Sequence, residues 1–72
     1  MEIAEFYKNI ANRIKYLRKK QGLTQEKLAE RAEISLDYLG KIETCANKPG
    51  LIALFKIINS LTVTFEEFFK EF

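Results

Sequence analysis

The chain of 72 residues has no histidine and no tryptophan, and it has only one cysteine, one proline and three glycines. Histidine and cysteine supply most metal ligands and most nucleophile–base pairs, so their scarcity argues against both kinds of site. A glycine-rich phosphate-binding loop is also missing. The sequence therefore predicts no catalytic site, no metal site and no cofactor, and we do not expect an enzyme.

The lone cysteine, Cys45, excludes an intramolecular disulfide and is typical of proteins of the reducing cytosol. No apolar run approaches the roughly eighteen residues that a membrane span requires. The N-terminus carries Glu2 and Glu5 and lacks the pattern of a signal peptide. We expect a cytoplasmic location and no membrane partner.

The formal net charge is only +2, but it is unevenly distributed. Residues 1–22 carry six basic and two acidic side chains, whereas residues 23–72 carry six basic and eight acidic ones. A basic segment beside an acidic remainder suits an oriented approach to a polyanion. A solvated helix face would explain the same charges equally well.

Helical periodicity is visible from the N-terminus. Apolar residues recur at steps of three and four, which predicts one amphipathic helix over residues 3–21. Basic residues in its last turn and Gly22 after it are a standard helix stop. Thr24 and Ser35 are typical N-caps, so a second and a third helix should begin directly after them.

The second half of the chain predicts two more helices. Residues 44–50 cannot be helical throughout because they contain Pro49. Apolar residues between Leu51 and Leu61 mark a fourth helix, and Thr64 with Glu67 has capping-box spacing before a fifth helix over residues 65–72. Since no useful alternating pattern appears, we predict an all-α fold of five helices in a single domain spanning residues 1–72.

One segment carries a recognisable motif. Residues 13–51 read RIKYLRKKQGLTQEKLAERAEISLDYLGKIETCANKPGL. This segment closely resembles the helix-turn-helix transcription regulators of the lambda-repressor and Cro type, the xenobiotic-response-element (XRE) family, and a weaker resemblance covers about residues 10–69. It implies a five-helix lambda-repressor-like domain with the motif at about residues 25–44. It also implies a recognition helix at about residues 35–43, lying in the major groove of DNA.

The resemblance assigns DNA contacts to particular side chains. Gln25 matches a glutamine that bonds a phosphate beside a helix N-terminus. In the recognition helix, Leu36 would pack on a thymine methyl, Asp37 would accept from cytosine, and Lys41 would donate to guanine or phosphate. The expected DNA-binding residues are Gln25, Ser35, Leu36, Asp37, Tyr38, Lys41, Asn47 and Lys48, the last two as backbone contacts of the loop after the recognition helix.

Several of these assignments have structural alternatives. Gln25 can instead be a surface residue in the first turn of its helix. Asp37 and Lys41 stand four residues apart on a helix, so they can pair with each other instead of with bases. Tyr38 can touch a phosphate through its hydroxyl or simply pack against the core.

The resemblance also identifies residues of the frame. Arg18 and Glu43 match a pair that the family uses as a structural ion pair. Arg18 is therefore expected to support the fold, whereas Arg13 is left open as a phosphate anchor or a solvated charge.

The chain departs from the family pattern at four positions. Glu33 stands where the turn usually has glycine, and because a positive φ is uncommon for other residues, we expect either local strain or an altered turn. Gly40 replaces the usual serine within the recognition helix, either to let DNA approach closely or because it is tolerated. Cys45 and Ala46 stand where glycine and a basic residue are typical, which removes one expected phosphate contact.

The predicted function is sequence-specific binding of double-stranded DNA by a small homodimeric transcriptional regulator, a repressor or autoregulator, at a palindromic operator. The phenylalanines of residues 64–72 exceed what one face of a short helix needs, so a subset of them is expected to join the fourth helix in the dimer surface. The small size resembles stand-alone repressors and the controller proteins of restriction–modification systems, and no small-molecule effector is expected. The alternative is an antitoxin or a protein-interaction module with the same fold.

Overall fold

The computed structural model describes residues 1–72, and it contains five helices and no strand. In chain order the helices are α1 (Ile3–Lys20), α2 (Gln25–Ala32), α3 (Leu36–Glu43), α4 (Leu51–Ser60) and α5 (Phe65–Phe69). The predicted all-α fold is confirmed. None of these helices is both long enough and apolar enough to cross a bilayer.

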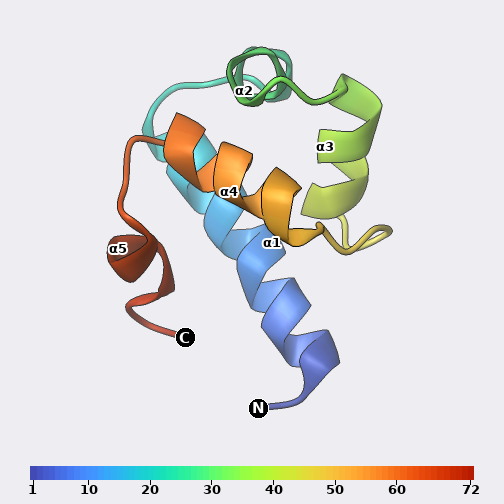
Figure 1. Cartoon of the computed structure of the whole chain (residues 1–72), viewed down its shortest axis with the longest axis vertical. Coiled ribbons are helices and arrows are strands. Elements are labelled where there is room, and N and C mark those ends of the chain that lie inside the picture. Colours follow the sequence, from blue (N-terminus) through green and yellow to red (C-terminus); the bar gives the residue numbers. More distant parts are fainter.

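The helices surround a single cluster of apolar side chains. Helix α2 packs against both α3 and α4, and α1 packs against α3. In Figure 1, α3 and α5 lie on opposite sides of the crossing between α1 and α4. The largest fully buried side chains come from every helix and from the residue after α4: Ile10, Ile14, Leu28, Leu39, Ile42, Ile57, Ile58, Leu61 and Phe68.

Two of the predicted helix starts are confirmed by capping hydrogen bonds. The Thr24 hydroxyl accepts from the backbone N–H of Lys27 at 3.0 Å, and the Ser35 hydroxyl accepts from that of Tyr38 at 3.0 Å. Each bond satisfies a donor that would otherwise lack a partner in the first helical turn. Local sequence thus sets where α2 and α3 begin.

The end of α1 lies one residue before its predicted position. The helix stops at Lys20, and Gln21 is its C-cap, with its N–H bonded to Leu17 O at 3.0 Å. Gly22 follows with a φ of +71°, a left-handed conformation that glycine adopts without steric cost. The predicted stop signal is therefore correct to within one residue.

A capping box begins α5. The Glu67 N–H donates to the Thr64 hydroxyl at 3.0 Å, and the Thr64 N–H donates to the Glu67 carboxylate at 2.9 Å. This bond from the Thr64 backbone holds the pKa of Glu67 below its ordinary value of 4.5. The start of the helix is as predicted.

The prediction that the fifth helix continues to residue 72 is wrong. Helix α5 ends at Phe69, and the chain then turns so that the Phe72 N–H bonds to Phe69 O at 3.2 Å. The turn places the Phe72 ring 5.9 Å from Phe6 of α1 and 4.8 Å from Phe69. Aromatic packing across the chain therefore overrides the local helical pattern.

Candidate nucleic-acid interface

The turn between α2 and α3 has a strained backbone. Glu33 lies in the left-handed region at φ 57° and ψ 42°, so of the two expected alternatives, strain or an altered turn, the structure has the strained one. Its N–H bonds to Glu30 O at 3.2 Å, and the next residue's N–H bonds to Ala29 O at 3.0 Å. These bonds close the turn, although a non-glycine residue in this conformation costs on the order of 1 kcal/mol.

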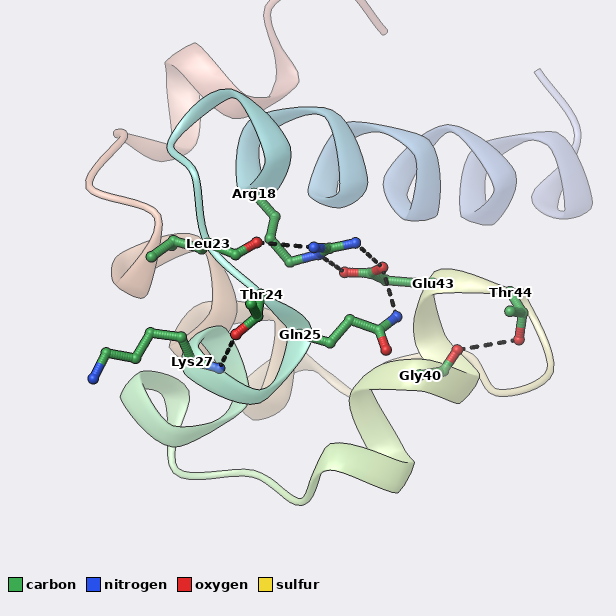
Figure 2. Close-up of polar contacts among 8 residues, drawn as sticks. All are labelled: Arg18, Leu23, Thr24, Gln25, Lys27, Gly40, Glu43 and Thr44. Carbon is green, nitrogen blue, oxygen red and sulfur yellow. Dashed lines mark hydrogen bonds and ion pairs between the residues drawn. The ribbon is translucent and has the colours of Figure 1, made fainter.

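A buried ion pair fixes α3 relative to α1. Arg18 Nε donates to Glu43 Oε2 at 2.8 Å, and Arg18 Nη2 donates to Glu43 Oε1 at 3.1 Å. Arg18 Nη1 also donates to the carbonyl of Leu23 at 2.9 Å. The two residues are only 8% and 2% exposed, so the pair belongs to the interior and confirms the structural role that the resemblance implied (Figure 2).

Gln25 extends this network into α2. Its Nε2 donates to Glu43 Oε1 at 2.9 Å, which joins the first residue of α2 to the last residue of α3 (Figure 2). One of the two amide hydrogens is thereby used, and the side chain is half-buried. The predicted phosphate contact of Gln25 stays a prediction, and it would have to use the other amide hydrogen or the backbone N–H.

The outward face of α3 carries the predicted base-reading residues. Ser35, Leu36, Asp37 and Lys41 are all exposed, Leu36 by 47%. Lys41 Nζ lies 3.1 Å from Asp37 Oδ2, so the structural alternative for these two side chains is present in the free protein. Their side chains are 51% and 78% exposed, and such a solvated pair contributes little and can exchange its partner.

Tyr38 has a different environment from its neighbours. Its side chain is half-buried and packs against the hydrophobic core. The packing alternative is therefore present in the structure, whereas the phosphate contact of its hydroxyl stays a prediction.

The loop after α3 presents the remaining predicted residues. Asn47 and Lys48 are exposed, and the Asn47 N–H bonds to Lys41 O at 3.1 Å. Cys45 has a φ of +65°, so it adopts the conformation expected of the glycine that it replaces. Lys48 Nζ lies 5.6 Å from the centre of the Tyr7 ring. Sequence reasoning missed Tyr7 because it precedes the recognisable motif.

Arg13, left open as a phosphate anchor or a solvated charge, makes contacts within the protein, and its phosphate contact is not tested by them. Its Nη2 donates to the carbonyl of Glu67 at 3.1 Å, and its guanidinium carbon lies 5.7 Å from the centre of the Tyr16 ring. Arg13 therefore ties α1 to α5, on the side of the molecule away from α3 (Figure 1).

A helix-turn-helix family model matches residues 14–68. The chain belongs to the helix-turn-helix family. The match covers the buried network, the turn at Glu33 and the outward face of α3, so it confirms the family inferred from the motif. A search of curated proteins found no significant match.

Solved structures extend the likeness of this helix-turn-helix protein to the whole fold. Two are crystal structures of the restriction-modification controller protein C.Esp1396I. A single-site mutant is 25% identical, with a TM-score of 0.88 over 96% of this chain and 87% of that one. The tetramer in complex with its natural 35 base-pair operator is 26% identical, with a TM-score of 0.86 over 97% and 90%.

A third structure is an HTH_3 family transcriptional regulator from Vibrio cholerae. It is 36% identical, with a TM-score of 0.85 over 93% of this chain but only 38% of that chain. Together the comparisons show that this protein is similar to helix-turn-helix transcription regulators, the class of protein that the sequence predicts.

Within this helix-turn-helix frame, Gly40 is not required by packing. A Cβ atom built at Gly40 meets nothing within 4 Å. The glycine is thus tolerated by the fold, and any need for it must come from a partner that approaches α3.

Proposed function

We propose that this helix-turn-helix protein is a small transcriptional regulator that binds double-stranded DNA sequence-specifically, with α3 in the major groove. The observation that carries the proposal is the exposed polar face of α3 and its N-cap, at Ser35, Asp37 and Lys41. The last residue of this helix, Glu43, is bonded to Arg18 of α1, which fixes the helix in place. Side chains on such a face can meet base edges without moving the core.

Two backbone contacts would flank the recognition helix. The N-terminus of α2 has free backbone N–H groups that suit a phosphate beside Gln25. On the other side, Asn47 and Lys48 stand exposed in the loop after α3. Contacts of this kind set the register of a protein on DNA, and they make its affinity fall with salt.

Selection from a pool of random duplexes tests the proposal directly. We expect enrichment of a defined sequence with twofold symmetry. Failure to enrich any sequence at low salt would refute specific recognition. The selected duplex then serves for the variants that separate base reading from backbone contact.

The two lysines of the interface should behave differently. Lys41→Ala should relax the preference for one base position, by about 1–3 kcal/mol. Lys48→Ala should weaken all sequences alike and flatten the dependence of affinity on salt. Lys70→Ala is the matched control, because this exposed lysine follows α5, far from α3 (Figure 1). Equal effects of the first two variants on specificity would show that the recognition surface is misassigned.

We also propose that the regulator is a homodimer. Helix α4 and the start of α5 form an apolar surface of four exposed side chains: Leu51 at 79%, Ile52 at 74%, Phe55 at 52% and Phe65 at 40%. The rings of Phe55 and Phe65 lie 5.8 Å apart, which makes the surface continuous between the two helices. A second copy covering this surface would be related by a twofold axis, which suits a palindromic operator.

Only one of the four C-terminal phenylalanines takes part in this apolar surface. Phe68 is fully buried, and Phe69 and Phe72 are half-buried and pack against the core. Three of the four rings are thus used within the protein. Of these four phenylalanines, Phe65 alone is therefore left for the dimer surface.

Sedimentation of the DNA-free protein tests the dimer. At micromolar concentration we expect a dimer that Phe55→Ser converts to monomer. Ile3→Ser is the matched control, because Ile3 is 67% exposed but belongs to the first turn of α1 and not to the apolar surface of α4 and α5. A wild-type monomer, or equal effects of both substitutions, would refute this interface.

The match to C.Esp1396I over nearly the whole of this chain supports a regulator of the restriction-modification controller type. We propose that it acts in the cytoplasm. We propose repression or regulation of its own gene. A reporter placed behind the protein's own promoter should respond to added protein, and an unchanged reporter would exclude autoregulation.

A further inference from the structure

The first turns of α1 lie outside the family match, which begins at residue 14. They nevertheless touch the loop that follows the recognition helix. Lys48 Nζ lies 5.6 Å from the centre of the Tyr7 ring, and Cys45 Sγ lies 3.9 Å from the Tyr7 carbonyl oxygen. Tyr7 thus contacts two residues of the loop proposed to meet the DNA backbone.

Tyr7 is itself held in place. It is half-buried and packs against the core, and its ring meets Phe6 edge-on at 5.5 Å. Phe6 in turn stacks on Phe69 at 6.2 Å, with the rings nearly parallel at 6°, and meets Phe72 at 5.9 Å. The aromatic packing between α1 and the C-terminal segment therefore fixes Tyr7.

We infer that Tyr7 is a positioning residue for the contact of Lys48 with the DNA backbone, an inference that rests on the proposed function. An unrestrained lysine loses rotamer entropy when it binds a phosphate. A lysine already held over an aromatic ring has lost part of that entropy beforehand. The ammonium has three donors, so a phosphate can approach it while the lysine stem stays against the ring.

Competition is the opposite effect that the same geometry permits. A cation attracted to the ring could be withheld from the phosphate, in which case removal of the ring would tighten DNA binding. Attraction between an exposed cation and a ring is weak, whereas charge-assisted bonds to phosphate are strong. Positioning is therefore favoured over competition. The two are distinguishable because removing the ring should weaken DNA binding if Tyr7 positions Lys48 and tighten it if Tyr7 competes for Lys48.

A double-substitution cycle on the full chain tests the inference. The probe is a mixed-sequence duplex, and affinity is measured by fluorescence anisotropy at several salt concentrations. Tyr7→Leu should weaken binding about two- to fivefold, which is part of the entropic cost of immobilising one side chain. Tyr7→Phe, which keeps the ring face, should restore the wild-type affinity. In a Lys48→Ala background, Tyr7→Leu should have no further effect.

Tyr16→Leu is the matched control. The Tyr16 ring also has a lysine over it, with Lys20 Nζ at 5.7 Å, but it is not part of the interface. This substitution should leave both the affinity and its salt dependence unchanged. Thermal unfolding of each variant identifies any loss of folded protein.

The outcomes separate the inference from the proposed function. Absence of binding by the wild-type protein to any duplex would overturn the proposed function itself. Binding by the wild type with additive effects of Tyr7→Leu and Lys48→Ala, or tighter binding by Tyr7→Leu, would overturn the positioning role alone. If Tyr7→Leu does not fold, the Lys48 Cε proton shifts of the wild type decide. An upfield ring-current shift that persists in the DNA complex supports the inference, and its absence overturns it.

Discussion

Breaking the buried ion pair should destabilise this protein more than any other single polar substitution. Arg18→Met would leave the Glu43 carboxylate, 2% exposed, with one hydrogen bond, from Gln25 at 2.9 Å, in place of three. Leaving one member of a buried pair uncompensated costs roughly 3–5 kcal/mol. A domain of this length has only about 4–11 kcal/mol of total stability, so the loss is a large fraction of it.

Removing both partners should restore much of that loss. In Arg18→Met with Glu43→Leu, no charge remains buried, and replacing a buried pair by apolar groups is often neutral or better. Two polar groups still lose a partner, the Gln25 amide and the Leu23 carbonyl, at about 1–3 kcal/mol each if water cannot reach them. Both residues are half-buried, so water satisfies them in part. The double variant should therefore be more stable than Arg18→Met alone.

Urea unfolding followed by far-UV circular dichroism measures these free energies. Lys27→Met is the control, because the Lys27–Glu30 pair is solvated, at 54% and 73% side-chain exposure, and should contribute less than about 1 kcal/mol. An Arg18→Met loss no larger than that of the control would refute the reasoning. The reasoning would also be refuted if the double variant lost as much free energy of unfolding as Arg18→Met and Glu43→Leu lose separately when their losses are added.

Three further perturbations have definite expected results. Glu33→Gly should raise the free energy of unfolding by on the order of 1 kcal/mol in urea unfolding, because it removes the left-handed strain; an unchanged midpoint would mean that the strain is absent. Gly40→Ala should add about 0.5–1 kcal/mol by the same assay, and a fall in DNA affinity in the stabilised variant would show that DNA needs the glycine. Because the pKa of Glu67 is lowered in the folded state, the stability from its cap should be present above its ordinary pKa of 4.5 and lost as pH falls through the folded value. Glu67→Gln should remove that part of the pH dependence of unfolding, and an identical profile would contradict the capping role.

Helix starts were predictable from local residues, and one helix end was not. Thr24, Ser35 and Thr64 accept from N–H groups three residues ahead, so neighbouring residues alone determine these caps. The end of α5 depends on Phe72 meeting Phe6, at the other end of the chain. Because no local sequence pattern contains that contact, the helical periodicity predicted a fifth helix that is longer than the observed one.

The candidate site divides in the same way. Helical spacing and the motif were enough to place Leu36, Asp37 and Lys41 on the outward face of α3. The Gln25 bond to Glu43 joins residues 18 positions apart, and the Cys45 contact with Tyr7 joins residues 38 apart. Partners at such separations depend on how the helices pack. Sequence therefore indicated which residues lie on the exposed face of α3 more readily than it indicated the contacts that hold this helix in place.

The position of α3 is imposed by the tertiary structure more than by its own helical propensity. The helix has eight residues, which is short for independent stability, and it includes Gly40. Glu33 before it and Cys45 after it both have left-handed backbones that glycine would relieve. Such strain persists only where surrounding contacts over-determine the conformation. Here the backbone bonds of the two turns, Ile34 N–H to Ala29 O at 3.0 Å and Cys45 N–H to Ile42 O at 3.2 Å, hold the strained residues, and the hydrogen bonds to Glu43 fix the helix between them. Because the side chains proposed to read bases take no part in those bonds, substitutions on the outward face should change which DNA is bound while leaving the fold intact.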